Sequence, residues 1–227
     1  MIVRMGLSKK LPGLSTAEFR RHWREVHGPL AAKMPGLRAY HRNHIVDKTQ
    51  LAIDHDRGNW DLDGISELWF DDLASMDRAI ASDAYPPTVA DSPRLIAATT
   101  VIVAEQTVVV PRADSPLIKR ISILERRKGM SRDEFRTEWL GKHAAMVADF
   151  PLLAGYTQNL VIGRGQAPGI DDDTGEPPLD GIVEMWFRNQ QDLCAAFRSP
   201  AADTSQAHAL HFLETITAFL VEPHVVI

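Results

Sequence analysis

Two histidines, each followed thirteen residues later by a tyrosine, are the residues of this chain whose types and spacing best suit acid–base chemistry. His27 precedes Tyr40, and His143 precedes Tyr156. An imidazole with a pKa of about 6.5 can accept or donate a proton at neutral pH, and a tyrosine hydroxyl can orient a carbonyl or stabilise an enolate. These four residues are the candidate catalytic residues. Each can instead be a core residue whose polar atoms have partners inside the protein.

Tryptophans and glutamates form a second group of candidates, because they could line a ligand cleft. Glu67 and Glu184 each precede a tryptophan by two residues, so strand alternation places both side chains on one side of a sheet. A carboxylate in an apolar strand can be an acid in a cleft, or it can pair with an arginine at the rim of a barrel. The tryptophans are equally suited to the core. The substrate-binding candidates are Trp23, Glu67, Trp69, Trp139, Glu184 and Trp186.

The chain repeats itself, with an offset of 116 residues in the first part of each copy and 117 in the second. Leu14–Trp23 aligns with Met130–Trp139, and Glu67–Phe70 aligns with Glu184–Phe187. One residue of slippage over a whole repeat indicates two copies of one unit. A short segment bracketed by prolines separates them. The sequence predicts a first unit at 1–111, a linker at 112–116 and a second unit at 117–227.

Each copy has the element order β-α-β-β-α-β. The first helix begins at Ser15 with Glu18 three residues later, which is the spacing of a capping box. On this helix Phe19, Trp23 and His27 are four residues apart, so they share one inward face. In the first copy we expect strands at 2–8, 37–46, 64–70 and 100–110 and a second helix at 72–82; in the second copy we expect strands at 118–124, 153–162, 181–187 and 217–227 and a second helix at 189–199.

This element order predicts the fold class. A four-stranded antiparallel sheet with two helices on one face leaves its other face bare. Two such bare faces bury each other when they pack together, and the result is a barrel-like core. We therefore expect an α+β protein in which two tandem units form a pseudo-dimeric barrel.

Composition excludes several classes of function. The formal net charge is −5, and the basic residues are not gathered into a stripe, so nucleic acid is not an expected partner. No apolar run approaches the length of about 18 residues that a membrane span needs, and the first residues lack the pattern of a signal peptide. Cys194 is the only cysteine, which excludes an intrachain disulfide. We expect a cytoplasmic protein.

Other motifs do not support a metal or nucleotide site. Strand alternation places His41 and His44 on opposite faces, which argues against a metal site that would also include His55. Residues 171–176 resemble the opening of a calcium loop, but the twelfth position is Ile182, so a surface loop is expected. The sequence contains no phosphate-binding glycine loop, nucleophile elbow or dinucleotide fingerprint. We predict neither a metal nor a cofactor.

Three motifs together resemble the EthD family. They are the first-helix pattern from Leu14 to Leu30, with Glu18, Phe19, Trp23, His27 and Gly28-Pro29; Pro35-Gly-Leu followed by Tyr40; and Asp63-Gly-Ile followed by Glu67-Leu-Trp-Phe70. The second copy is similar but has Ala144-Ala-Met where the first has Gly28-Pro-Leu. The family belongs to the dimeric α/β-barrel superfamily, whose usual member is one ferredoxin-like unit that dimerises through its sheet. The resemblance therefore implies an ordinary dimer fused into one chain.

The resemblance also implies a chemistry. Relatives include a methylmuconolactone methylisomerase and fungal polyketide dehydratases or decarboxylases. In the isomerase-like relatives a first-helix histidine and a tyrosine at this spacing are implicated, which points to His27 with Tyr40 and to His143 with Tyr156. We expect a cofactor-free acid–base enzyme of the isomerase, dehydratase or lyase type. Its substrate would be a small hydrophobic carbonyl or lactone compound of degradative or secondary metabolism.

Two other functions remain open at this stage. The same barrel could hold a small hydrophobic molecule without turning it over, or it could be a scaffold in which both histidines belong to the core. Further dimerisation of the fused barrel is also possible. A protein with the same fold could bind haem or act as a monooxygenase, as some members of the superfamily do.

Overall fold

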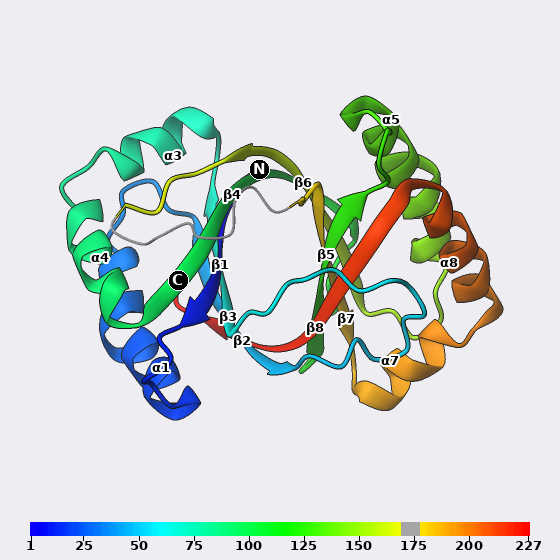
Figure 1. The fold of residues 1–227 in the computed structure, drawn as a ribbon, viewed down its shortest axis with the longest axis horizontal. Coiled ribbons are helices and arrows are strands. Elements are labelled where there is room, and N and C mark those ends of the chain that lie inside the picture. The colour runs from blue at the N-terminus through cyan, green and yellow to red at the C-terminus, as the bar shows by residue number, and fades with distance from the viewer. Residues whose placement is uncertain (169–177) are drawn as a thin grey trace.

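The computed structural model describes residues 1–168 and 178–227. Within that part of the chain, eight antiparallel strands form a closed barrel in the order β1-β3-β2-β8-β5-β7-β6-β4 (Figure 1). The predicted pseudo-dimeric α+β barrel is therefore confirmed.

Each copy contributes one half of the barrel. The first half has the order β4-β1-β3-β2 and the second has β8-β5-β7-β6, which is the same arrangement. β2 pairs with β8 and β4 pairs with β6, so each half closes the free edges of the other. The strands are β1 Ile2–Lys10, β2 Ala39–Asp47, β3 Gly64–Phe70, β4 Ile96–Val110, β5 Ile118–Arg126, β6 Gly155–Arg164, β7 Gly181–Phe187 and β8 Leu213–Val225.

The helices lie outside the barrel, with those of the first copy on one side and those of the second on the other (Figure 1). Both predicted capping boxes form, at Ser15 with Glu18 and at Ser131 with Glu134. The helices of the first copy are α1 Thr16–His22, the π-helix η1 Trp23–His27, α2 Gly28–Ala31, α3 Leu73–Ile80, α4 Tyr85–Asp91 and the 3₁₀-helix η2 Ser92–Arg94; those of the second are α5 Arg132–Thr137, the π-helix η3 Glu138–His143, α6 Ala144–Ala148, α7 Gln190–Phe197 and α8 Pro200–Phe212.

The structure adds one helix per copy that the sequence pattern did not predict. These are α4 and α8; α8 leads directly into β8, and the short 3₁₀-helix η2 joins α4 to β4. Both α4 and α8 begin with proline in the first turn, where the missing N–H costs nothing. The last strands also begin earlier than predicted, at Ile96 and Leu213. The predicted linker 112–116 lies between β4 and β5.

A tryptophan fixes the first helix against the sheet in each copy. A side chain added at Gly64 would overlap the indole of Trp23, and one added at Gly181 would overlap the indole of Trp139. The glycine of each Asp-Gly-Ile motif therefore makes room for the tryptophan that lies one helical turn before the histidine. This contact sets where each histidine meets the sheet.

No helix in the described ranges, 1–168 and 178–227, is long and apolar enough to span a membrane.

Candidate functional site

Two clefts lie between the helices and the outer face of the barrel, one in each copy. The first cleft surrounds His27 and has a cavity volume of about 50 Å³. The second cleft surrounds His143 and has a cavity volume of about 70 Å³. Tyr40 lines the first cleft and Tyr156 lines the second, so each predicted histidine–tyrosine pair meets at one cavity.

Both histidines end a π-helical segment. In the first copy the backbone N–H of Gly28 donates to the carbonyl oxygen of Trp23, five residues back, so the turn that carries His27 is wider than an α-helical turn. His143 ends the corresponding segment of the second copy. Short π-helical turns inside α-helices are frequent at functional sites because they redirect one side chain.

In the first cleft, a buried carboxylate holds His27. Its Nδ1–H donates to Asp91 Oδ2 at 3.1 Å, and His22 Nε2–H donates to Asp91 Oδ1 at 2.9 Å. Asp91 is only 5% exposed and His27 is 8% exposed. Nε2 of His27 has no hydrogen-bond partner among the described residues. Burial lowers the pKa of His27, and the hydrogen bond to Asp91 partly opposes this, so the ring is neutral at pH 7.

Tyr40 provides a neutral hydroxyl on the wall of the first cleft. Trp23 Nε1–H donates to its Oη at 3.0 Å, which leaves the hydroxyl hydrogen of Tyr40 free to point elsewhere. Burial raises the pKa of Tyr40 to about 12. The tyrosine therefore stays protonated and can act as a hydrogen-bond donor.

The second cleft differs in the partner of its histidine. His143 Nδ1 lies 3.3 Å from His208 Nδ1, and His208 Nε2 lies 3.1 Å from Glu138 Oε2. Burial and the neighbouring imidazole lower the pKa of His143 to about 3. Burial likewise raises the pKa of Tyr156, whose hydroxyl accepts a hydrogen bond from Gln158 at 2.8 Å.

Asp91 and His208 are not among the residues predicted from the sequence, although the sequence contains a signal for both. With the offset of 117 residues, Asp91 and His208 occupy the same position of the repeat. The first copy has an aspartate there and the second copy has a histidine. α4 carries Asp91 and α8 carries His208. These were the two helices that the pattern missed, and their residues were missed with them.

Trp23 and Trp139 line the clefts, but the strand candidates lie elsewhere. Glu67 and Glu184 point into the barrel, where Lys119 Nζ lies 2.8 Å from Glu67 Oε2 and 2.7 Å from Glu184 Oε2. All three side chains are almost fully buried.

The strand tryptophans lie inside the barrel, near the ion cluster formed by Glu67, Lys119 and Glu184. Trp69 belongs to the barrel core, and the ammonium group of Lys119 lies 5.3 Å from the ring centre of Trp186. Neither cavity at the two histidines is lined by a strand tryptophan or by a glutamate of the cluster. The physical reason is strand alternation: the odd-numbered side chains of β3 face the interior, while Ser66 and Leu68 face the helices.

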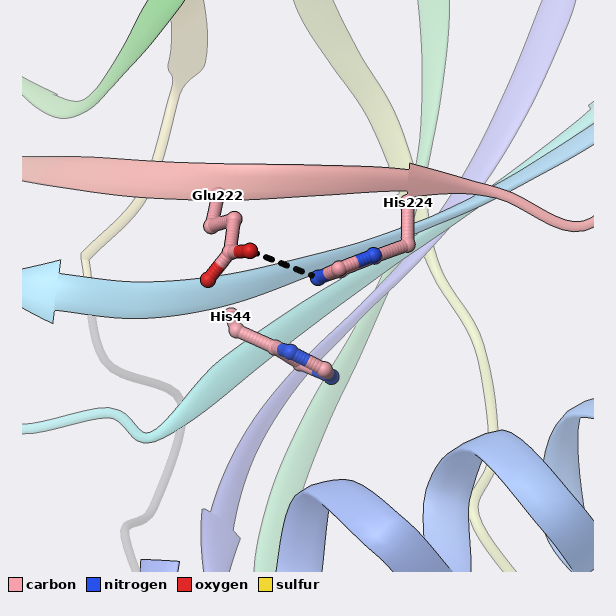
Figure 2. Close-up of side chains that lie close together, drawn as sticks. All are labelled: His44, Glu222 and His224. Carbon is pink, nitrogen blue, oxygen red and sulfur yellow. Dashed lines mark ion pairs between the residues drawn. The ribbon is translucent and has the colours of Figure 1, made fainter. Parts of the chain in front are cut away.

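The histidines at 41, 44 and 55 do not converge, in agreement with the alternation argument. His41 Nδ1 lies 3.8 Å from Glu67 Oε2 inside the barrel, and His55 lines the second cleft. His44 lies on the outer face, at the β2–β8 seam, with Glu222 and His224 (Figure 2). The ligand atoms of this trio lie within 4.8 Å of one another.

The trio in Figure 2 has the residue types of a metal site, but arginine side chains lie close to it. Glu222 Oε1 lies 3.4 Å from His224 Nε2, and Arg20 Nη1 lies 3.8 Å from Glu222 Oε2. Burial, followed by the charges of His224 and three arginines with Arg20 among them, lowers the pKa of His44 to about 3. That field disfavours a cation, so we assign the trio no metal-binding role.

The fold and its two helix–sheet clefts define a fused dimeric α/β barrel made of ferredoxin-like units. A family model described as the EthD domain matches the chain twice, at residues 11–99 and at residues 127–216. The chain belongs to the EthD family, with one EthD domain in each copy.

Solved structures agree with the fold. A protein of Lactobacillus acidophilus NCFM proposed to be a monooxygenase aligns with 99% of this chain and 94% of its own, at 10% identity and a TM-score of 0.61. An anthrone oxidase-like protein aligns with 99% of this chain and 92% of its own, at 10% identity and a TM-score of 0.65. At such identities the similarity concerns the fold alone. No curated protein gives a significant match.

Proposed function

We propose that this protein is a cofactor-free acid–base enzyme whose general base is His27 in the first cleft. The observation that carries the proposal is the 3.1 Å hydrogen bond from His27 Nδ1 to the buried carboxylate of Asp91. A carboxylate in this position fixes the tautomer of an imidazole and stabilises the imidazolium that forms when the ring takes a proton. The alternative is a barrel that binds a small molecule without reaction.

The proposed reaction begins at a carbon next to a carbonyl group. The C–H bond breaks, its proton goes to Nε2 of His27, and its electron pair becomes an enolate. Tyr40, which lines the same cleft and stays protonated, is suited to donate a hydrogen bond to the enolate oxygen. Return of the proton to another carbon completes an isomerisation. Loss of a leaving group from the neighbouring carbon completes an elimination.

The second cleft is the weaker base site in this proposal. His143 has a histidine, not a carboxylate, beside Nδ1, and its pKa is lowered to about 3. A base with so low a pKa has little driving force for proton removal. We propose that the second cleft binds an apolar group or reacts slowly, and that the first cleft is the principal site.

The test is solvent deuterium incorporation, which detects proton transfer without knowledge of the product. Small lactones, ketones and polyketide-like aromatics are incubated with the protein in D₂O and followed by NMR. We expect exchange next to the carbonyl with the wild type, and a loss of about 10²–10⁴-fold in His27→Gln. Asp91→Asn should slow exchange while leaving the ligand dissociation constant unchanged.

His143→Gln is the matched control, because it changes the equivalent residue of the other cleft. It should retain most of the exchange rate. Ligand binding with equal exchange in wild type and His27→Gln would contradict the proposal and support the non-catalytic barrel.

A further inference from the structure

The first cleft contains a buried guanidinium group that has no counter-charge among the described residues. Arg4 is 8% exposed, and its Nη2 donates to Tyr85 Oη at 3.0 Å and to the carbonyl oxygen of Gln166 at 3.1 Å. Both acceptors are neutral. Nε of Arg4 is buried without a hydrogen-bond partner. No carboxylate of the described residues lies within ion-pair distance of this side chain.

A buried cation of this kind is costly. Transfer of an unpaired charge into a protein interior is penalised unless an opposite charge or several hydrogen bonds compensate. Burial lowers the pKa of Arg4, which reports the same penalty. Arginine presents its N–H groups in a planar fork that matches a carboxylate, so an anionic ligand would supply the counter-charge that residues 1–168 and 178–227 do not.

The free part of this guanidinium faces the space around the candidate base. Arg4 lines the cavity of the first cleft and also an adjoining cavity of about 70 Å³, and His27 lines both. Ser8, Ser66 and Thr88 line both as well. The arginine, the base and three hydroxyl groups therefore line both of two neighbouring cavities.

The second cleft keeps only part of this polarity, because Ser205 replaces Thr88 but two other hydroxyl positions are apolar. The repeat places Leu124, Val183 and Ala202 where the first cleft has Ser8, Ser66 and Tyr85. Arg120 occupies the position of Arg4, but it donates to the carbonyl oxygen of Leu51 and lies 4.6 Å from the ring centre of Phe197. The second arginine is thus covered by the chain itself, and the cavity beside it is apolar.

We propose that Arg4 binds the carboxylate of the substrate in the first cleft, which makes that substrate a small keto acid or lactone acid. This inference rests on the proposed function, because it gives the substrate of His27 a second anchoring group. An anchored carboxylate holds the acidic C–H bond at a fixed distance from the base. The second cleft lacks this anchor and would prefer neutral ligands.

The test compares small acids with their methyl esters, which have nearly the same shape but no charge. Acetate, 4-oxopentanoate and benzoate are titrated against the wild type by calorimetry, each beside its methyl ester. We expect the acids of best fit to bind about tenfold or more tightly than their esters, as a charge-assisted hydrogen bond implies. Arg4→Met should abolish that preference, and Arg4→Lys should keep part of it.

Arg120→Met is the matched control, since it removes the equivalent buried arginine from the other copy, and it should keep the preference for acids. Equal binding of acid and ester by the wild type, or no binding of any acid, would overturn the proposal without the need for a variant. A preference that survives in Arg4→Met would overturn it too.

The deuterium assay separates this inference from the proposed function. Arg4-dependent binding of acids without any exchange would leave the carboxylate site in place and reject His27 as the base. Exchange of neutral ketones that depends on His27, with no preference for acids in binding, would support His27 as the base and reject the carboxylate site at Arg4.

Discussion

At the scale of single residues, one position of the repeat decides how each cleft histidine behaves. Asp91 and His208 occupy that position in the first and second copies. A carboxylate beside His27 supports a proton on the ring, whereas an imidazole beside His143 opposes one. Burial lowers the pKa of both histidines, and the residue at this position opposes that effect in the first copy and reinforces it in the second.

The depressed pKa of His143 predicts a dependence of stability on pH. Its pKa is about 3 in the folded protein, against an ordinary value of 6.5, so the unfolded chain binds a proton that the folded protein excludes. The stabilisation is fully present above about pH 6.5 and is lost as the pH falls toward 3. The wild type should therefore lose more thermal stability between pH 7.5 and about pH 5 than His143→Gln does.

His27→Gln is the comparison variant for the pH dependence of stability. In the wild type, the hydrogen bond to Asp91 opposes the lowering of the pKa of His27. His27→Gln should change the acid dependence less than His143→Gln. Parallel melting curves against pH for all three proteins would show that His143 is solvated and not buried as described.

The residues of the clefts could be predicted only in part from the sequence. Helical spacing brought Trp23 and His27 to one face, and the repeat doubled that evidence. The sequence pattern could not assign Glu67 to the barrel interior, because nearly every residue of β3 is buried, whichever face its side chain is on. Strand alternation then sorts the side chains of β3 into two faces, but it does not indicate which face contacts the helices. Asp91 was missed because α4 is seven residues long and too short for a periodic pattern.

At the scale of elements, the contact of a tryptophan with a strand glycine positions each first helix. Gly64 and Gly181 lie under the indoles of Trp23 and Trp139. Alanine at either glycine should displace the indole and destabilise the protein by about 1–3 kcal/mol, as overpacked cores do. Denaturant unfolding measures this free energy.

Gly163→Ala is the control for these two variants. Gly163 also lies in a strand, and an added side chain would have no atom within 4 Å. Its stability should stay within about 0.5 kcal/mol of the wild type. A cost for Gly163→Ala equal to that of Gly64→Ala would assign the effect to strand propensity and not to the tryptophan contact.

The elements themselves were largely predictable. The repeat gave eight strands in the right order along the chain, and β3 and β7 have the predicted bounds. The bare faces of two sheets implied a barrel, because apolar surface must be buried. The closure at the seams, β2 with β8 and β4 with β6, is a long-range pairing that no local pattern encodes.

At the scale of the whole molecule, one lysine breaks the two-fold symmetry at the centre of the barrel. Glu67 and Glu184 are equivalent residues of the two copies, and Lys119 lies between them, while the first copy has Val3 at the matching position. A fused chain can place one ammonium between two equivalent carboxylates, whereas a dimer of identical chains would place two. Burial and the charge of Glu184 raise the pKa of Glu67, and Lys119 opposes that rise.

Removal of Lys119 should therefore lower the free energy of unfolding by more than the loss of the lysine's apolar contacts alone would. Lys119→Met leaves two buried carboxylates without a counter-charge, a change that costs about 3–5 kcal/mol. The triple variant Lys119→Met/Glu67→Gln/Glu184→Gln should recover much of the loss, because neutral amides keep hydrogen bonds such as that from Asn159. Denaturant unfolding at pH 7.5 measures both. A single variant as stable as the triple variant would mean that the carboxylates are already protonated, and that Lys119 contributes packing and not charge.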